Sequence, residues 1–196
     1  GRAGTTDANL AQIVELTERM AEISAQLKQF SRPSGDTLTA VSVPACFGYA
    51  LRLYQARLNE AGVEVIYAWP EAETWVRADL VRLEQVLVNL IGNALQAMSE
   101  TPMPRLTLAI EPIDDRVRLS VADNGPGIET AHLARIFEPF FTTKSPGSGL
   151  GLGLSISSRI IDDLGGRLTV GNQPQGGAIF TVTLPADTAP RRDTSS

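Results

Sequence analysis

The sequence of 196 residues contains a single cysteine, Cys46, and a single histidine, His132. A lone cysteine forms no internal disulfide, and no CxxC pair or histidine cluster is present to bind zinc. No apolar run approaches the ~20 residues that a membrane-spanning helix needs. Basic residues are not in excess either, since the net charge is −5, which argues against a general nucleic-acid binder. These absences exclude a disulfide-stabilised scaffold, a histidine-rich metal site and a two-histidine mechanism.

The sequence does contain enough apolar material for a core. Hydrophobic residues make up 43% of the chain, which excludes wholesale disorder. The length fits one ordinary globular domain plus an extra element. We therefore expect a soluble, acidic protein whose last residues, 187–196, have the composition of a flexible tail.

Residues 1–35 have the pattern of one helix followed by a domain boundary. Apolar residues recur in steps of three and four, at Ile13, Leu16, Met20, Ile23, Leu27 and Phe30. This heptad seam is narrower than the apolar stripe of an ordinary surface helix. It favours packing in a coiled coil or four-helix bundle over the alternative, packing on the helix's own domain. Pro33 and Gly35 end the helix, so we place the boundary there.

The remaining residues, 36–186, mix helical and strand periodicity. Helical patterns cover residues 45–60, 79–99, 129–137 and the part of 148–164 that follows its glycines. Strand patterns cover residues 63–69, 106–111, 116–123, 167–170 and 178–184. Because neighbouring strands are joined by short turns and helices lie elsewhere, we expect an α+β fold. Its expected form is a two-layer sandwich, with helices on one face of a mixed, largely antiparallel sheet.

The predicted helix 79–99 carries a polar stripe. At 100° per residue, the stripe lies nearly opposite the leucines and consists of Arg82, Gln85, Asn89, Asn93 and Gln96. A solvated face is the simplest explanation, but such faces usually carry Glu and Lys, and asparagine within a helix has poor propensity. The amides of Asn89 and Asn93, one turn apart, are able to ligate a hard cation through oxygen and to meet phosphate oxygens.

A turn-rich segment, Asp-Asn-Gly-Pro-Gly-Ile at 123–128, follows the predicted strand 116–123. A tight turn is one interpretation, since Asn-Gly and Pro-Gly are common turn residues. Asp123, however, ends an apolar strand, where its carboxylate lies at the edge of the core and suits a ligand amino group. Gly125 and Gly127 allow the backbone to approach a flat ring closely.

Two further segments follow. In residues 136–144, two adjacent phenylalanines precede two threonines and Lys144, and a buried loop is the simple interpretation. From Gly147 to Gly153, glycines alternate before a helix, which exposes N–H groups at the positive end of a helix dipole and suits phosphate. The spacing is not that of a P-loop, because no Gly-Lys-Ser/Thr follows, and no parallel dinucleotide-binding unit surrounds it.

Taken in this fixed order, the four motifs resemble the ATP-binding domain of sensor histidine kinases. That domain belongs to the superfamily that also includes gyrase, Hsp90 and MutL. The resemblance covers about residues 36–185, and the run FFTTK…GLGLGLSIS is similar to the nitrogen-regulation and C4-dicarboxylate sensor subgroup. Residues 1–35 resemble the second helix of the family's dimerisation and phosphoacceptor domain.

The resemblance implies roles for the asparagines and for the segment at 123–128. Asn93 would coordinate Mg²⁺ that bridges the phosphates of ATP, with Asn89 helping one turn earlier. Asp123 would accept a hydrogen bond from the adenine amino group. Gly125 and Gly127 would line the base.

The resemblance also implies a mobile lid over the nucleotide. Phe140 and Phe141 would anchor the lid, and Lys144 would reach the phosphates. The lid hinge and the helix start that holds the triphosphate would be formed by Gly149, Gly151 and Gly153. Many family members have Lys or Arg where this chain has Gln96, which shifts phosphate neutralisation toward Lys144, the helix terminus and Mg²⁺.

The residue at position 89 bears on the reaction type. The ATPases of this superfamily place a water-activating glutamate one turn before the metal-binding asparagine, and Asn89 at that position cannot act as a general base. Glu84 lies off the stripe. The resemblance therefore implies a protein-histidine kinase that transfers the γ-phosphoryl group of Mg-ATP to a histidine. The alternatives are a non-catalytic nucleotide-binding or dimerisation module and, less favoured, an Hsp90- or MutL-type ATP hydrolase.

His132 is a poor phosphoacceptor, because it lies between the two central motifs. We expect the acceptor histidine on a helix upstream of residue 1, so that this chain holds no catalytic residue and does not autophosphorylate. The family resemblance implies a response-regulator receiver domain as partner, a homodimer formed through the N-terminal helix bundle, and no nucleic acid. It also implies the cytoplasmic portion of an inner-membrane sensor, with membrane contact only through upstream segments.

Overall fold

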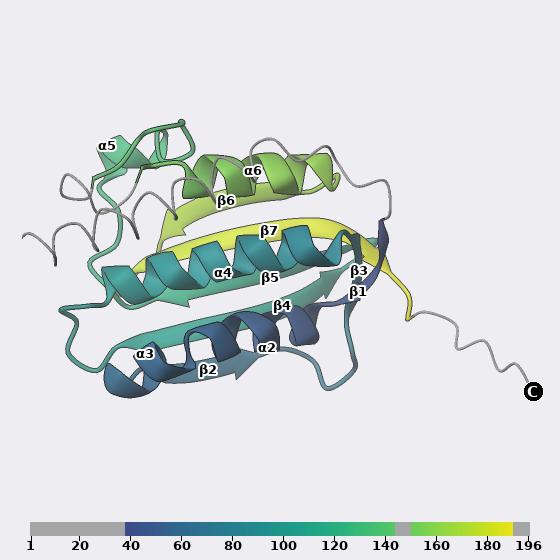
Figure 1. The fold of residues 1–196 in the computed structure, drawn as a ribbon, viewed down its shortest axis with the longest axis horizontal. Coiled ribbons are helices and arrows are strands. Elements are labelled where there is room, and N and C mark those ends of the chain that lie inside the picture. The colour runs from purple at the N-terminus through teal and green to yellow at the C-terminus, as the bar shows by residue number, and fades with distance from the viewer. Residues whose placement is uncertain (1–37, 144–149, 190–196) are drawn as a thin grey trace, which may run out of the picture.

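The computed structural model describes residues 38–143 and 150–189. Together these residues form a mixed sheet of seven strands with helices packed on one face (Figure 1). The helix predicted within residues 1–35, Lys144, Gly149 and residues 190–196 lie outside the described part. Within residues 38–143 and 150–189, no helix is both long enough and apolar enough to cross a membrane.

The last described strand, β7, pairs with three other strands of the sheet. The strands are β1 Thr39–Ser42, β2 Glu64–Ala68, β3 Trp75–Ala78, β4 Arg105–Ile113, β5 Arg116–Asp123, β6 Arg167–Asn172 and β7 Ala178–Asp187. Their order across the sheet is β1–β3–β7–β5–β4–β2, and β6 pairs with β7. One edge of β7 pairs with β5, while the other pairs first with β6 and then, at Ala186 and Asp187, with β3. Of the described strand pairs, β2–β4 is parallel and the rest are antiparallel.

Three helices cover one face of this sheet. The described residues form the helices α2 Val43–Leu53, α3 Gln55–Glu60, α4 Leu80–Ala97, α5 Thr130–Leu133 and α6 Gly153–Asp163, of which α2, α4 and α6 cover the sheet (Figure 1). In Figure 1, α2, α4 and α6 lie side by side in front of the strands, with α4 in the middle. The predicted α+β sandwich, with helices on one face of a mixed and largely antiparallel sheet, is confirmed.

The core lies between α4 and the central strands. Leu83, Leu87 and Leu90 recur at helical spacing along α4 and are fully buried. They meet inward-facing strand residues such as Leu108 and Leu119, which are also buried. Full burial of a leucine side chain contributes about 1.5–3 kcal/mol, so α4 is held firmly against the sheet. The polar stripe on the same helix is therefore carried by a rigid element.

Helices α4 and α6 run antiparallel and are linked at two levels. Arg82, in the first turn of α4, forms an ion pair with Asp163 at the end of α6, with 2.6 Å between Nη2 and Oδ2. Two turns further along α4, Asn89 donates a hydrogen bond to Ser157 of α6, at 2.9 Å. The beginning of α6 therefore lies beside the second half of α4, where the asparagines are.

Several predicted elements differ in detail from the observed ones. The helix predicted over 45–60 is interrupted at Tyr54, whose hydroxyl packs closely over the α-carbon of Gly92 in α4. The short strands β1 and β3 were not predicted, because each has four residues and no long alternation. The helix expected over 129–137 is confined to the four residues of α5, and the helix within 148–164 begins at Gly153.

Candidate functional site

Asp123, the last residue of β5, is the one buried acidic residue in the described part of the chain, with 3% of its surface exposed. Its Oδ1 accepts hydrogen bonds from the backbone N–H groups of Gly125, at 2.9 Å, and Ala178, at 3.3 Å. Burial raises the pKa of the Asp123 carboxyl, and the two hydrogen bonds oppose that rise. Since both bonds end on Oδ1, Oδ2 is the oxygen able to accept from a further donor.

The two glycines after Asp123 are tightly packed. A Cβ on Gly125 would lie 3.0 Å from the carbonyl oxygen of Ala97, at the end of α4. Gly127 has a φ of +78°, and a Cβ there would lie 2.9 Å from Oδ1 of Asn172. The structure thus gives both glycines a packing role, and their predicted contact with a flat ring stays a prediction.

The turn between β6 and β7 holds this segment from one side. The backbone N–H of Ile128 donates to Oδ1 of Asn172, at 2.8 Å, and Nδ2 of Asn172 donates back to the carbonyl of Ile128, at 2.6 Å. Nε2 of Gln173 donates to the carbonyl of Asp123, also at 2.6 Å. These residues were not predicted from the sequence. The pair Gly176–Gly177 could have marked a tight turn, whereas nothing in the sequence marks Asn172.

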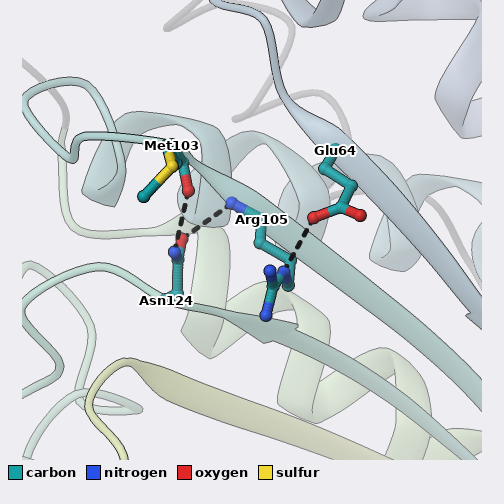
Figure 2. A network of polar contacts seen from close by, with 4 residues as sticks. All are labelled: Glu64, Met103, Arg105 and Asn124. Carbon is teal, nitrogen blue, oxygen red and sulfur yellow. Dashed lines mark hydrogen bonds and ion pairs between the residues drawn. The ribbon is translucent and has the colours of Figure 1, made fainter.

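Asn124 holds the same segment from the other side (Figure 2). The backbone N–H of Arg105 donates to Oδ1 of Asn124, at 2.7 Å, and Nδ2 of Asn124 donates to the carbonyl of Met103, at 3.0 Å. The Arg105 side chain in turn pairs with Glu64 of β2, at 2.9 Å. The end of β5 is therefore held by β4 and the residues before it on one side and by the turn between β6 and β7 on the other. These contacts fix the position of Asp123.

The predicted residues Asn89 and Gly153 lie against each other across α4 and α6. Nδ2 of Asn89 donates to Oγ of Ser157, and its Oδ1 faces Gly153, where a Cβ would lie only 2.5 Å away. Glycine is therefore the residue that fits at the first position of α6. Asn93 lies one turn further along α4 and is half-buried.

The N-terminus of α6 differs from those of the other two long helices. Ser42 accepts from a backbone N–H in the first turn of α2, and Asp79 does the same for α4. Among the described residues, no side chain caps α6 in this way. The first N–H groups of a helix have no partner within it, so an uncapped N-terminus is suited to an anion.

Phe141 is held by neighbours from the region around α5. The guanidinium carbon of Arg135 lies 4.6 Å from the centre of the Phe141 ring, and the His132 ring meets it edge-on with centroids 5.5 Å apart. The N–H of Phe140 donates to the carbonyl of Gly151, at 3.0 Å, and the Phe140 side chain is 71% exposed. Gly151 has a φ of +66° and packs directly on the Phe141 carbonyl. Lys144 and Gly149, predicted to act nearby, lie outside the described residues.

The family of the chain follows from comparison with known proteins. A model of the histidine kinase-, DNA gyrase B- and HSP90-like ATPase family matches residues 78–188. The chain belongs to this family, and its relatives place it with the histidine kinase type.

In the part of the chain that the structure describes, no group of three or more His, Cys, Asp or Glu residues is placed to hold a metal ion.

Particular relatives narrow this assignment. The C4-dicarboxylate transport sensor protein DctB of Pseudomonas aeruginosa is 42% identical over 183 residues, which cover 92% of this chain and 30% of DctB. This likeness agrees with the predicted C4-dicarboxylate sensor subgroup, and the chain spans less than a third of DctB. Full-length ShkA in complex with AMPPNP is similar with a TM-score of 0.77 and 30% identity, covering 96% of this chain and 40% of ShkA. Histidine kinase ThkA in complex with the response regulator TrrA gives a TM-score of 0.78 and 26% identity, covering 95% of this chain and 53% of ThkA.

Proposed function

We propose that residues 36–186 are the ATP-binding kinase core of a two-component sensor histidine kinase. The observation that carries the proposal is the environment of Asp123. A carboxyl group that is almost fully buried, with no basic side chain paired to it among the described residues, is costly for the fold. Such groups are candidates for ligand binding, and the family of the chain is one of ATPases.

Asp123 would bind the base of the nucleotide. Its Oδ1 is occupied by the N–H groups of Gly125 and Ala178, so Oδ2 would accept from the adenine amino group. Gly125 and Gly127, on the same segment, would line the base. Because Asn124 and Asn172 fix this segment from both sides, the carboxyl is oriented before the ligand arrives.

The first turn of α6 would hold the phosphates. Its uncapped N–H groups and the positive end of the helix dipole suit a triphosphate. The amide oxygens of Asn93 and Asn89 are hard donors of the kind that Mg²⁺ accepts, so the residues present fit a magnesium nucleotide. When bound, Mg²⁺ would supply positive charge against the phosphate oxygens.

The segment between Phe141 and Gly153 would close over the nucleotide. The contacts of Phe141 with Arg135 and His132 support its role as an anchor of the lid, and exposed Phe140 is assigned to the same anchor. Lys144 would reach the phosphates, with Gly149, Gly151 and Gly153 as hinge and helix start. Gln96, at a position that many family members fill with Lys or Arg, leaves more of the phosphate charge to Lys144 and α6.

The residue at position 89 favours phosphoryl transfer over hydrolysis. A neutral amide, here bonded to Ser157, takes no proton from water near pH 7, so no general base stands at this position. The γ-phosphoryl group would instead pass to a histidine on a helix upstream of residue 1, and then to an aspartate of a response regulator. The complex of ThkA with TrrA supports a receiver domain as that partner. By itself this chain is proposed to lack the catalytic histidine and not to autophosphorylate.

We also assign roles to the two ends of the chain and to the full-length protein. We assign residues 1–35 to the second helix of a dimerisation bundle, which would make the full-length protein a homodimer, and residues 187–196 to a flexible tail. We also assign the chain to the cytoplasmic portion of an inner-membrane sensor. Exchange of Ile23 in the apolar seam for lysine tests the dimer. The Ile23→Lys variant should sediment as a smaller species than the unchanged chain in analytical ultracentrifugation.

Calorimetry and a transfer assay test the kinase proposal together. The 196-residue chain should bind AMPPNP with Mg²⁺, and mixing it with ATP and a separate helical domain that carries the acceptor histidine should produce phosphohistidine. Steady phosphate release without such a domain would instead identify an ATP hydrolase. Nucleotide binding without any transfer would identify a non-catalytic binding module.

A further inference from the structure

Ser157 is a buried hydroxyl in an apolar contact between helices. It is 2% exposed and lies on the face of α6 that also buries Ile156, Ile160 and Ile161. A buried hydroxyl is costly to the fold unless it is hydrogen-bonded. Its partner is Nδ2 of Asn89, at 2.9 Å, on the polar stripe of α4. This serine thus touches a residue of the proposed site without facing the ligand itself.

The Asn89 amide adopts one of its two possible orientations, in which the Ser157 hydroxyl accepts a hydrogen bond from Nδ2. The terminal torsion of asparagine is broad and roughly two-fold, so oxygen and nitrogen could exchange places. With Nδ2 bonded to Ser157, Oδ1 is directed at Gly153, the first residue of α6. The positive end of the helix dipole favours the oxygen there and disfavours the NH₂ group. Gly153 supplies the space for the oxygen, and Ser157, one turn later, supplies the acceptor for the nitrogen.

We infer that Ser157 is a positioning residue for the metal and phosphate end of the site. It holds Asn89 with its amide oxygen presented at the start of α6, where a magnesium-bound phosphate chain requires an oxygen donor rather than an N–H donor. This inference rests on the proposed nucleotide-binding function. Ser157, in the interface between α4 and α6, would thus contribute to the preference of the site for the magnesium complex of the nucleotide.

A double-mutant cycle with AMPPNP tests the inference on the 196-residue chain. Ser157→Ala removes the hydrogen bond that orients the Asn89 amide, and it should weaken binding of Mg-AMPPNP about fivefold. Asn89→Ala should weaken it at least as much, and the double variant should bind no more weakly than Asn89→Ala alone. Additive losses in the double variant would overturn the inference, because Ser157 would then act independently of Asn89.

Two further measurements separate positioning from general loosening of the helices. Asp163→Ala removes the ion pair with Arg82 at the far end of the same helix pair, and its affinity for Mg-AMPPNP should stay within about twofold of the unchanged chain. In the ligand-free protein, the NMR signals of the Asn89 side-chain NH₂ should shift in Ser157→Ala and stay in place in Asp163→Ala. An unshifted Asn89 signal in Ser157→Ala would overturn the inference even if nucleotide binds normally. Failure of the unchanged chain to bind AMPPNP would instead refute the proposed function itself.

Discussion

Gly177 packs directly on the backbone carbonyl of Asp123, so closely that a Cβ at position 177 would overlap the carbonyl oxygen. The φ of Gly177 is +90°, a conformation that L-residues rarely adopt. The turn before β7 therefore closes onto the end of β5 at the residue that carries the buried carboxyl. The adjacent residue, Ala178, donates its N–H to Oδ1 of the same aspartate. Backbone and side chain of Asp123 are thus both set by one turn.

Exchange of Gly177 for alanine should damage stability and nucleotide binding together. The positive φ and the overlap with the Asp123 carbonyl combine, so we expect a loss of roughly 2–4 kcal/mol in the free energy of unfolding. Gly62→Ala is the matched control, since Gly62 also has a positive φ, of +61°, but nothing lies within 4 Å of its Cβ position. It should cost only the roughly 1–2 kcal/mol of the backbone strain. Urea unfolding of the two variants measures the difference, and equal losses would contradict the close packing.

Asp123→Asn should separate stability from binding. Burial raises the folded pKa of Asp123 above its ordinary value of 3.8, so the folded protein holds this proton to higher pH than the unfolded chain does. The corresponding stability is fully present below the ordinary value and is lost as pH rises through the folded pKa. Because asparagine does not ionise, the variant should gain stability relative to the unchanged chain as the pH is raised from 4 to 7.

The same variant should no longer bind nucleotide. Asparagine still accepts from Gly125 and Ala178 through its oxygen, but presents NH₂ where the adenine amino group needs an acceptor. Calorimetry with AMPPNP at pH 7 should show no binding, while the circular-dichroism spectrum remains that of the unchanged chain. Undiminished affinity would remove Asp123 from the proposed site.

Helices and strands were predictable from the sequence where a hydrophobic periodicity extends over many residues. The strand 116–123 was predicted with its observed ends, because four inward-facing residues alternate along it. The break at Tyr54 was not, because the local sequence is helical throughout and the interruption lies where Tyr54 packs on Gly92, thirty-eight positions later in the chain. A contact with an element that is distant in the chain does not alter the local hydrophobic pattern, so the pattern does not predict it.

The candidate site divides in the same way. Asp123 and the asparagines of α4 were found because their residue types are unusual for their positions. Asn172 and Ser157 were missed, because an asparagine at a strand end and a serine in a helix are ordinary, and only the fold brings them to Ile128 and Asn89. Sequence therefore indicated the residues proposed to touch ligand, whereas the residues that hold them in place required the structure.

Asn172→Ala tests whether the turn between β6 and β7 supports binding. The variant loses both hydrogen bonds to Ile128, and because Asn172 is exposed we expect a loss of only about 1 kcal/mol in stability. Affinity for AMPPNP should nevertheless fall several-fold, since the segment that follows Asp123 is released on one side. Thr169→Ala, which removes an exposed hydrogen bond from the same strand, should leave affinity unchanged. Equal affinities of the two variants would show that the support is dispensable.

Cys46 provides a reporter for ligand binding. It is the sole cysteine of the chain, fully buried in α2, and burial together with the nearby charge of Glu84 raises the pKa of its thiol to about 12. Since the thiolate is the reactive form, iodoacetamide at pH 8 should modify Cys46 only when the protein opens. A ligand that binds the folded state alone, present at 100 times its Kd, should slow this modification about 100-fold. Mg-AMPPNP should do so for the unchanged chain and not for Asp123→Asn, as mass spectrometry of the modified fraction over time would show. Rapid modification at a rate that depends on neither urea nor nucleotide would contradict the burial of Cys46.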